Sequence, residues 1–352
     1  EMKKLLDRIF IDGLGGMAQG LFATLIIGTI IQQIGLFMGG GTGDLIYELG
    51  KIAAGLTGAG IGVGVARKLE AGHLVIVSAA VVGMIGAFAG KILSGQVLVD
   101  GNLVLAGPGE PLGAFAAAYL AIEIGILISG KTKLDIILTP LVCIGTGSAV
   151  GLFVGPPISE FMLWLGSLIN WGTEQQPFLM GIVVSVLMGM ILTLPISSAA
   201  LGVILNLSGL AAGAATIGCC CNMIGFAVAS WRENKFSGFL AQGIGTSMLQ
   251  IPNIVRRPLI WLPVILSSAV LGPIGTMLLH MTNNATGSGM GTAGLVGPLM
   301  TWQVMTQSEA GVIVLGKIIL IQFILPAAGT LLISEFMRKK KWIRQGDMKL
   351  EL

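Results

Sequence analysis

The feature that most constrains the fold is a series of long apolar stretches that contain almost no charged residues. Charged residues make up 11% of the chain and hydrophobic residues 54%, whereas soluble proteins carry about 25% charged residues. A helix of about 20 apolar residues spans a bilayer. The expected spans are Leu14–Met38, Asp44–Ala66, Leu74–Leu93, Leu112–Ser129, Ile136–Val154, Phe178–Leu194, Leu259–Leu279 and Ala310–Phe336. The sequence therefore predicts an all-α polytopic membrane protein of about nine or ten transmembrane helices, with re-entrant hairpins and interfacial amphipathic helices.

Basic residues predict the orientation of these spans. Lys and Arg concentrate in cytoplasmic loops, which assigns the segments around Arg67–Lys68, Lys131–Lys133 and Arg338–Arg344 to the cytoplasm. We expect both termini on that side. Residues 177–230 must then cross an odd number of times, either as helical spans or as a span plus a half-inserted hairpin. We favour the hairpin, with a break around Pro195–Gly209.

We expect a single integrated membrane domain with two parts. Residues 1–155 form N-terminal transmembrane helices, and residues 156–352 form a C-terminal part with amphipathic helices and re-entrant hairpins. Pro156 and Pro157 should end a span, because proline breaks the helical hydrogen-bond ladder. Ile158–Trp171 and Ser237–Val255 read as interfacial amphipathic helices, and Val97–Leu105 reads as a β-hairpin.

A polar, glycine-rich segment, His280–Trp302, stands between two apolar stretches. Asn283, Asn284 and Thr286 supply hydrogen-bonding groups, and the following glycines interrupt any regular helix. Irregular backbone at membrane depth is tolerated where it is buried in protein or lines a wet cavity, and such broken segments often bind substrate in transporters. We interpret it as a re-entrant hairpin that forms part of a solute site. The alternative is an external loop between two spans.

Neutral hydrogen-bonding residues supply the remaining candidates for solute binding. Glu174 and Gln175 lie in a second polar segment, Trp171–Phe178, Asn222 lies mid-span, and His280 ends a span. Amides and carboxylates can bond the hydroxyls of a sugar or polyol in pairs. Each residue could instead form a helix-to-helix hydrogen bond or a cap. Glu123, an acid within an apolar stretch, has either a functional role or a structural partner.

The sequence holds no catalytic constellation. His73 and His280 are its histidines, and neither lies in a hydrolase-type motif. The glycine clusters lack the lysine of a phosphate-binding loop. Cys143 and the consecutive Cys219–Cys221 have no zinc-binding spacing, so we expect buried, inert thiols. We expect no enzyme activity, cofactor, metal site or nucleic-acid partner.

The segments TNNATGSGMGTAGLVGPLMTW (Thr282–Trp302) and GTEQQPF (Gly172–Phe178), with the order of spans, resemble the membrane IIC component of bacterial sugar phosphotransferase systems. More narrowly, they resemble its stand-alone, perfringolysin-regulator-like branch. The resemblance covers nearly the whole chain. It implies a multi-pass protein of the bacterial cytoplasmic membrane that moves a sugar or related small polar solute.

The resemblance also implies a homodimer in which one part of each subunit forms the dimer contact and another carries the sugar in an elevator-like movement. In one large superfamily of such proteins a Gly-Ile-Thr-Glu motif supplies a glutamate to sugar hydroxyls. Gly172-Thr173-Glu174 is similar but lacks the isoleucine. No IIA or IIB domain is fused, so phosphorylating transport would need separate IIA/IIB partners, and a non-phosphorylating transporter stays open. The alternative is a membrane-bound sensor or regulator that binds a small metabolite without net transport.

Overall fold

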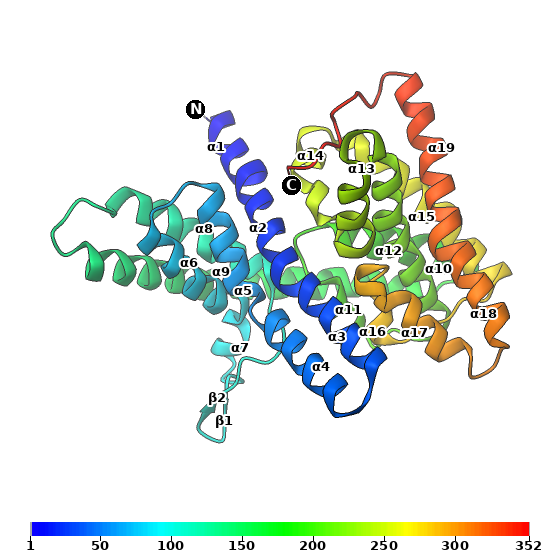
Figure 1. Ribbon diagram of the computed structural model, residues 1–352, viewed down its shortest axis with the longest axis horizontal. Coiled ribbons are helices and arrows are strands. Elements are labelled where there is room, and N and C mark those ends of the chain that lie inside the picture. The colour runs from blue at the N-terminus through cyan, green and yellow to red at the C-terminus, as the bar shows by residue number, and fades with distance from the viewer. Residues whose placement is uncertain (1, 352) are drawn as a thin grey trace. The chain divides into compact units, whose positions relative to one another are not determined.

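The computed structural model describes residues 2–351 and consists almost entirely of helices (Figure 1). The chain forms two compact units, Glu1–Met162 and Leu163–Leu352. The helix α9 (Asp135–Thr173) begins in the first unit and ends in the second.

Unit 1 is a helical bundle with one small hairpin. Its helical segments before α9 are α1 (Met2–Asp7), η1 (Arg8–Gly13), α2 (Leu14–Leu21), η2 (Phe22–Ile26), α3 (Ile27–Met38), α4 (Gly40–Gly55), α5 (Thr57–Lys68), α6 (His73–Ala87), α7 (Ala89–Leu93) and α8 (Pro111–Ile128). The predicted hairpin is confirmed, because β1 (Leu98–Val99) pairs antiparallel with β2 (Asn102–Leu103).

Unit 2 contains the broken segments. Its helical segments after α9 are α10 (Pro177–Thr193), α11 (Ser198–Ile204), α12 (Gly209–Ala229), α13 (Trp231–Leu240), η3 (Ala241–Gly245), η4 (Ser247–Gln250), α14 (Ile251–Arg256), η5 (Pro258–Trp261), α15 (Leu262–Pro273), η6 (Ile274–Leu278), α16 (Ala285–Ser288), η7 (Ala293–Leu295), α17 (Val296–Met305), α18 (Gly311–Ile318), η8 (Ile319–Ile324) and α19 (Leu325–Lys339).

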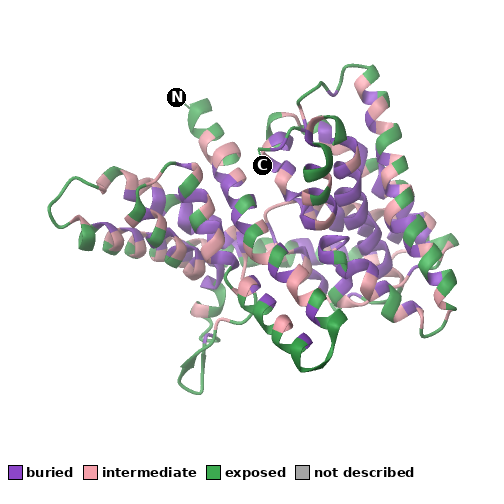
Figure 2. Cartoon of the chain, viewed as in Figure 1, coloured by how far each residue is buried: buried purple, intermediate pink, exposed green. Residues whose placement is uncertain are grey.

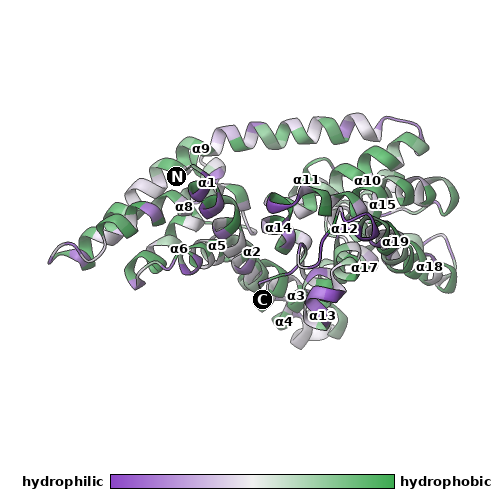
Figure 3. Ribbon diagram, turned by 90° about the horizontal axis from the view of Figure 1, so that it is seen from above, coloured by the Kyte–Doolittle hydropathy of each residue, from purple (hydrophilic) through white to green (hydrophobic). Residues whose placement is uncertain are grey.

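The apolar helices confirm the polytopic all-α class. Within residues 2–351, six helical stretches are long and apolar enough to cross a membrane, and α4 with α5, bent by 50°, make a seventh. The shorter apolar helices α6 and α10 add to these. Figure 3 shows the contrast between these apolar helices and the hydrophilic α13.

Two predictions about helix boundaries are wrong. Pro156 and Pro157 do not end a span, because α9 continues through both for 39 residues. Helices in apolar surroundings tolerate proline when neighbouring groups satisfy the freed carbonyls. The single amphipathic helix expected over Ser237–Val255 is also absent. That stretch is divided among α13, η3, η4 and α14, with several polar side chains buried.

Glycines let the helices of unit 1 approach closely. Gly58 and Gly62 of α5 face α6, whereas Gly60 and Gly64 face α2 and the helical segment η2 that follows it. A β-carbon at any of these positions would meet a backbone oxygen of the neighbouring helix. The spacing of small residues therefore gives α5 two packing faces, as expected of small-residue motifs in membrane helices.

The core of unit 2 is α12. Figures 1 and 2 show it as a buried helix among α10, α15 and α19. Ser185 lies against Gly218 and Thr193 bonds Asn222, so α10 and α12 run in the same direction. Residues 194–208 must therefore return along the unit, and α11 is the helical part of that return.

Candidate functional site

The segment that follows α15 folds back into unit 2 instead of leaving it. Asn283 forms a β-bridge with Gly209 at the start of α12, and Thr292 reaches Met223 near its middle, with an Oγ1–Sδ distance of 3.7 Å. The chain then returns, because the Asn283 amide donates to the Gly297 carbonyl over 3.2 Å. Most residues between 283 and 297 are buried. The re-entrant hairpin is thus present, and the alternative of an external loop is wrong.

The tip of this hairpin needs unusual backbone geometry. Gly291, Gly294 and Leu295 adopt positive φ angles of +53°, +54° and +60°. Glycine adopts this conformation without steric cost. The turn lets Thr292 donate its hydroxyl to the carbonyl of Gly243 in η3. The glycines that prevent a regular helix in this segment therefore form the turn at the tip of the hairpin.

The break after α10 forms a second inserted segment. Leu194 is extended, and Ser197 caps α11 by accepting a hydrogen bond from the Ala200 amide at 3.2 Å. Ser198 then donates to the carbonyl of Gly289, next to α16, over 2.6 Å. The two broken segments therefore contact each other within unit 2.

Asn222 is the centre of a buried polar cluster. Its Oδ1 accepts hydrogen bonds from Thr193 Oγ1 at 3.1 Å and from Trp261 Nε1 at 3.3 Å. Its Nδ2 donates to Gly218 O at 3.1 Å and to Ser268 Oγ at 3.5 Å. Ser247 joins the cluster through Thr193, with 2.8 Å between the hydroxyls. We call Thr193, Asn222, Ser247, Trp261 and Ser268 the Asn222 cluster.

The Asn222 cluster has the chemistry of a site for a hydroxylated solute. An amide can donate and accept at once, and hydroxyls can reverse their donor role. The half-buried Trp261 indole offers an apolar face beside these groups. Thr292 at the hairpin tip contacts Met223, the residue after Asn222, so the tip lies next to the cluster.

Other predicted residues of the hairpin hold its shape. Asn283 is buried and donates to Thr216 Oγ1 over 2.7 Å. Asn284 caps α16 by accepting a hydrogen bond from the Gly287 amide at 2.9 Å. Thr286 is exposed. In this arrangement Asn283 and Asn284 satisfy the backbone of the hairpin.

The remaining predicted residues lie elsewhere. Glu174 is exposed, and Gln175 donates to the Trp171 carbonyl at 2.9 Å, at the end of α9 that precedes α10. The exposed His280 follows η6, which is joined to the start of α10 by the bond from Thr276 Oγ1 to Pro177 O. Because α10 has 17 residues, its ends are about 24 Å apart. The structure does not bring Glu174, Gln175 or His280 together with Asn222.

Sequence reasoning missed the other members of the Asn222 cluster. Thr193, Ser247, Trp261 and Ser268 belong to different elements, separated by up to 75 positions in the chain numbering. The available signal was weak: polar side chains inside or beside apolar stretches. A hydroxyl in such a helix most often bonds its own backbone, as Ser268 also does with Val264 O at 2.8 Å.

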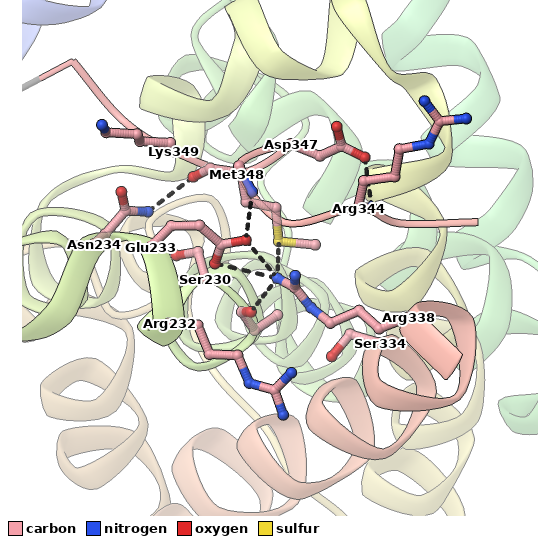
Figure 4. A network of polar contacts seen from close by, with 12 residues as sticks. Ser230, Arg232, Glu233, Asn234, Ser334, Arg338, Arg344, Asp347, Met348 and Lys349 are labelled. Atoms are coloured by element: carbon pink, nitrogen blue, oxygen red, sulfur yellow. Dashed lines mark hydrogen bonds and ion pairs between the residues drawn. The ribbon is translucent and has the colours of Figure 1, made fainter. Parts of the chain in front are cut away.

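A second buried polar network lies beneath the C-terminal segment. Asn234 bonds Met348 O and the Leu350 amide, both at 2.8 Å. Gln250 donates to Met348 O at 3.0 Å, and Asn253 donates to Lys349 O at 2.8 Å. Figure 4 shows the part of this network around Asn234 and Met348. These amides bond a peptide backbone, so they anchor the end of the chain.

Comparison with known families places these observations in context. A family model described as "Phosphotransferase system, EIIC" matches residues 11–350. A comparison with curated proteins finds no significant match.

Proposed function

The chain belongs to the phosphotransferase system EIIC family, and on this premise we propose that it carries a sugar or a related small polar solute across the bacterial cytoplasmic membrane. The family supports a multi-pass membrane transporter component that is not an enzyme by itself and that works with IIA and IIB proteins. Beyond what the family supports, we propose the location of the solute site, an elevator-like movement and a homodimer.

The observation that carries the proposal is the Asn222 cluster. Its amide, hydroxyl and indole groups lie in an apolar unit beside the tip of a re-entrant hairpin. Buried polar groups need partners, and those partners can be exchanged for the hydroxyls of a solute. We propose that the solute replaces some of the hydrogen bonds now made between Thr193, Asn222 and Ser247.

We further propose that unit 2 carries the solute in an elevator-like movement and that unit 1 forms a homodimer contact. Two features support this division. The re-entrant hairpin, α11 and the Asn222 cluster all belong to unit 2. In unit 1, α9 exposes large apolar side chains such as Ile137 and Phe153, which suit a lipid or subunit interface.

Thermal unfolding of the purified protein tests the solute site. A panel of sugars and sugar phosphates should contain a ligand that raises the unfolding temperature, because ligand bound only to the folded state stabilises it. Ser247→Ala and Asn222→Ala should weaken this ligand about tenfold or more, since each removes a hydrogen-bonding partner. If no sugar, sugar phosphate or related polar metabolite stabilises the protein, the proposal fails.

Matched variants separate a binding effect from general damage. Asn253→Ala removes a buried amide outside the cluster and should leave ligand affinity unchanged. Glu174→Ala tests the motif suggested by family resemblance, and Asn284→Ala tests the cap of α16. An affinity loss confined to Glu174→Ala would move the solute site to the start of α10.

The second candidate function is a membrane sensor of the perfringolysin-regulator-like type. One observation favours it: protein groups satisfy every hydrogen-bonding position of the Asn222 amide, an arrangement that can report binding without releasing solute to the other side. A flux assay in proteoliposomes separates the two functions. Ligand binding without uptake, even with candidate IIB partners present, would support the sensor.

A further inference from the structure

The last apolar span ends in a run of basic residues that the solute site does not use. From the last turn of α19 onward the chain reads RKKKWIR, Arg338–Arg344. Arg232, Arg338, Lys341, Ile343, Arg344 and Gln345 line a pocket of about 510 Å³ at this place. The residues belong to α13, α19 and the segment after α19, all within unit 2. No acidic side chain is among these lining residues.

Two of the lining cations are already neutralised. Arg232 Nη2 lies 2.8 Å from Glu335 Oε2, and Arg338 Nη2 lies 2.9 Å from Glu233 Oε1. Lys341 and Arg344 form no ion pair within residues 2–351. The backbone amide of Arg344 donates to Asp347 at 2.7 Å, and the ion-pair partner of Asp347 is Arg257, at 3.6 Å. The pocket therefore carries an excess of two positive charges.

Hydrogen bonds and burial fix the residues on one side of the pocket. The Arg338 side chain is 7% exposed and also donates to Ala229 O at 3.1 Å. Its Nε is buried without an acceptor among the described residues. Gly346 donates its amide to Glu233 at 3.3 Å, which ties the segment after α19 to α13. Figure 4 shows Arg338 held between these groups, with Arg344 on the same segment.

The surroundings of the pocket are those of a membrane surface. Phe336 and Trp342 are 53% and 49% exposed, and their rings meet edge to face with centroids 6.1 Å apart. Lys340 lies over the Phe336 ring, 5.9 Å from its centroid. Aromatic residues gather at the bilayer interface, and α19 carries exposed leucines such as Leu332 up to this level.

We propose that this pocket binds the phosphate of an anionic phospholipid head group. A basic pocket at the end of a membrane helix suits such a head group. Lys341 and Arg344 supply the unpaired charges, and Trp342 and Phe336 supply exposed aromatic rings of the kind that gather at the bilayer interface. The same charges would attract a soluble phosphate, but the exposed aromatic and leucine side chains favour the lipid. The inference does not depend on the proposed solute.

The test measures lipid binding to the purified, delipidated full chain. Short-chain phosphatidylglycerol is titrated, with phosphatidylcholine and inorganic phosphate as separate arms, and bound lipid is counted by native mass spectrometry. Phosphatidylglycerol should bind at least about tenfold more tightly than phosphatidylcholine. The double variant Lys341→Gln/Arg344→Gln should lose that preference. Neither side chain forms an ion pair with the described residues 2–351, so the variant should remain folded.

The matched control is Lys339→Gln/Lys349→Gln, which removes the same charge from exposed residues outside the pocket lining and away from the Phe336 ring. This control should keep the preference for phosphatidylglycerol. Equal losses in both double variants would show diffuse surface attraction and overturn the site. Binding of inorganic phosphate as tight as that of phosphatidylglycerol would overturn the assignment to a lipid. No preference for the anionic lipid in the unaltered protein would overturn it as well.

Discussion

Glu123 shows how a single acid is accommodated in an apolar helix. On α8, its Oε1 lies 2.5 Å from Arg8 Nε, and its Oε2 lies 3.3 Å from Arg8 Nη2. Tyr119, one turn earlier, donates its hydroxyl to the same carboxylate at 2.8 Å. Acids within membrane segments usually have such a partner. Of the roles open from the sequence, the structure provides the structural partner.

This pairing predicts an asymmetry between single and double substitutions. Glu123→Met should destabilise the protein by about 1–3 kcal/mol, because it leaves the Arg8 guanidinium without its carboxylate. Arg8→Met should act similarly. The double variant should be more stable than either single one, since no unpaired charge remains. Thermal unfolding in detergent measures all three, and a double variant less stable than both single ones would contradict the structural role of the pair.

At the scale of elements, glycine and small-residue patterns predict the local structure better than the positions of proline do. The small-residue spacing of α5 and the glycines of the His280–Trp302 segment both act in the structure as their chemistry requires. Pro156 and Pro157 do not end α9, because a membrane helix can continue through proline when neighbouring groups satisfy the freed carbonyls. Ser237–Val255 does not form the single helix that its apolar pattern predicts. Hydrogen bonds between buried amides, such as Gln242 and Gln250, stabilise an interrupted backbone there, and hydrophobic periodicity does not reveal such bonds.

The close packing of α10 on α12 predicts that two glycines, one at this contact and one outside it, respond differently to substitution by alanine. A β-carbon at Gly218 would overlap the backbone oxygen of Ser185 on α10, whereas one at Gly316 of α18 would meet nothing within 4 Å. Gly218→Ala should therefore destabilise the protein by about 1–3 kcal/mol. Gly316→Ala should leave stability unchanged or raise it by up to about 1 kcal/mol. The two unfolding temperatures, measured in the same detergent, check the difference. Equal values would contradict the packing of α10 against α12.

At the scale of the whole molecule, the sequence indicates which polar residues lie in apolar segments, but it does not predict which of them contact each other in the fold. Asn222 was found because an amide stands out in an apolar helix, yet its partners Thr193 and Trp261 come from other elements. Gly172-Thr173-Glu174 stands out because it resembles a family motif, yet Glu174 lies near the end of α10 opposite to Asn222. Contacts between residues far apart in the sequence determine where Asn222 and Glu174 lie. The spacing of residues along one sequence does not predict those contacts.

The proposed assembly yields a prediction that compares the two units. The four cysteines of the chain are buried, so an introduced surface cysteine is the preferred target of a mild oxidant. Phe153 on α9 and Leu332 on α19 are both large, apolar and exposed, at 83% and 72%. If unit 1 forms the homodimer contact and unit 2 moves, Phe153→Cys should form a disulfide-linked dimer in membranes and Leu332→Cys should not. Cross-linking only through Leu332→Cys would place the contact on unit 2 and remove the basis for a moving solute unit.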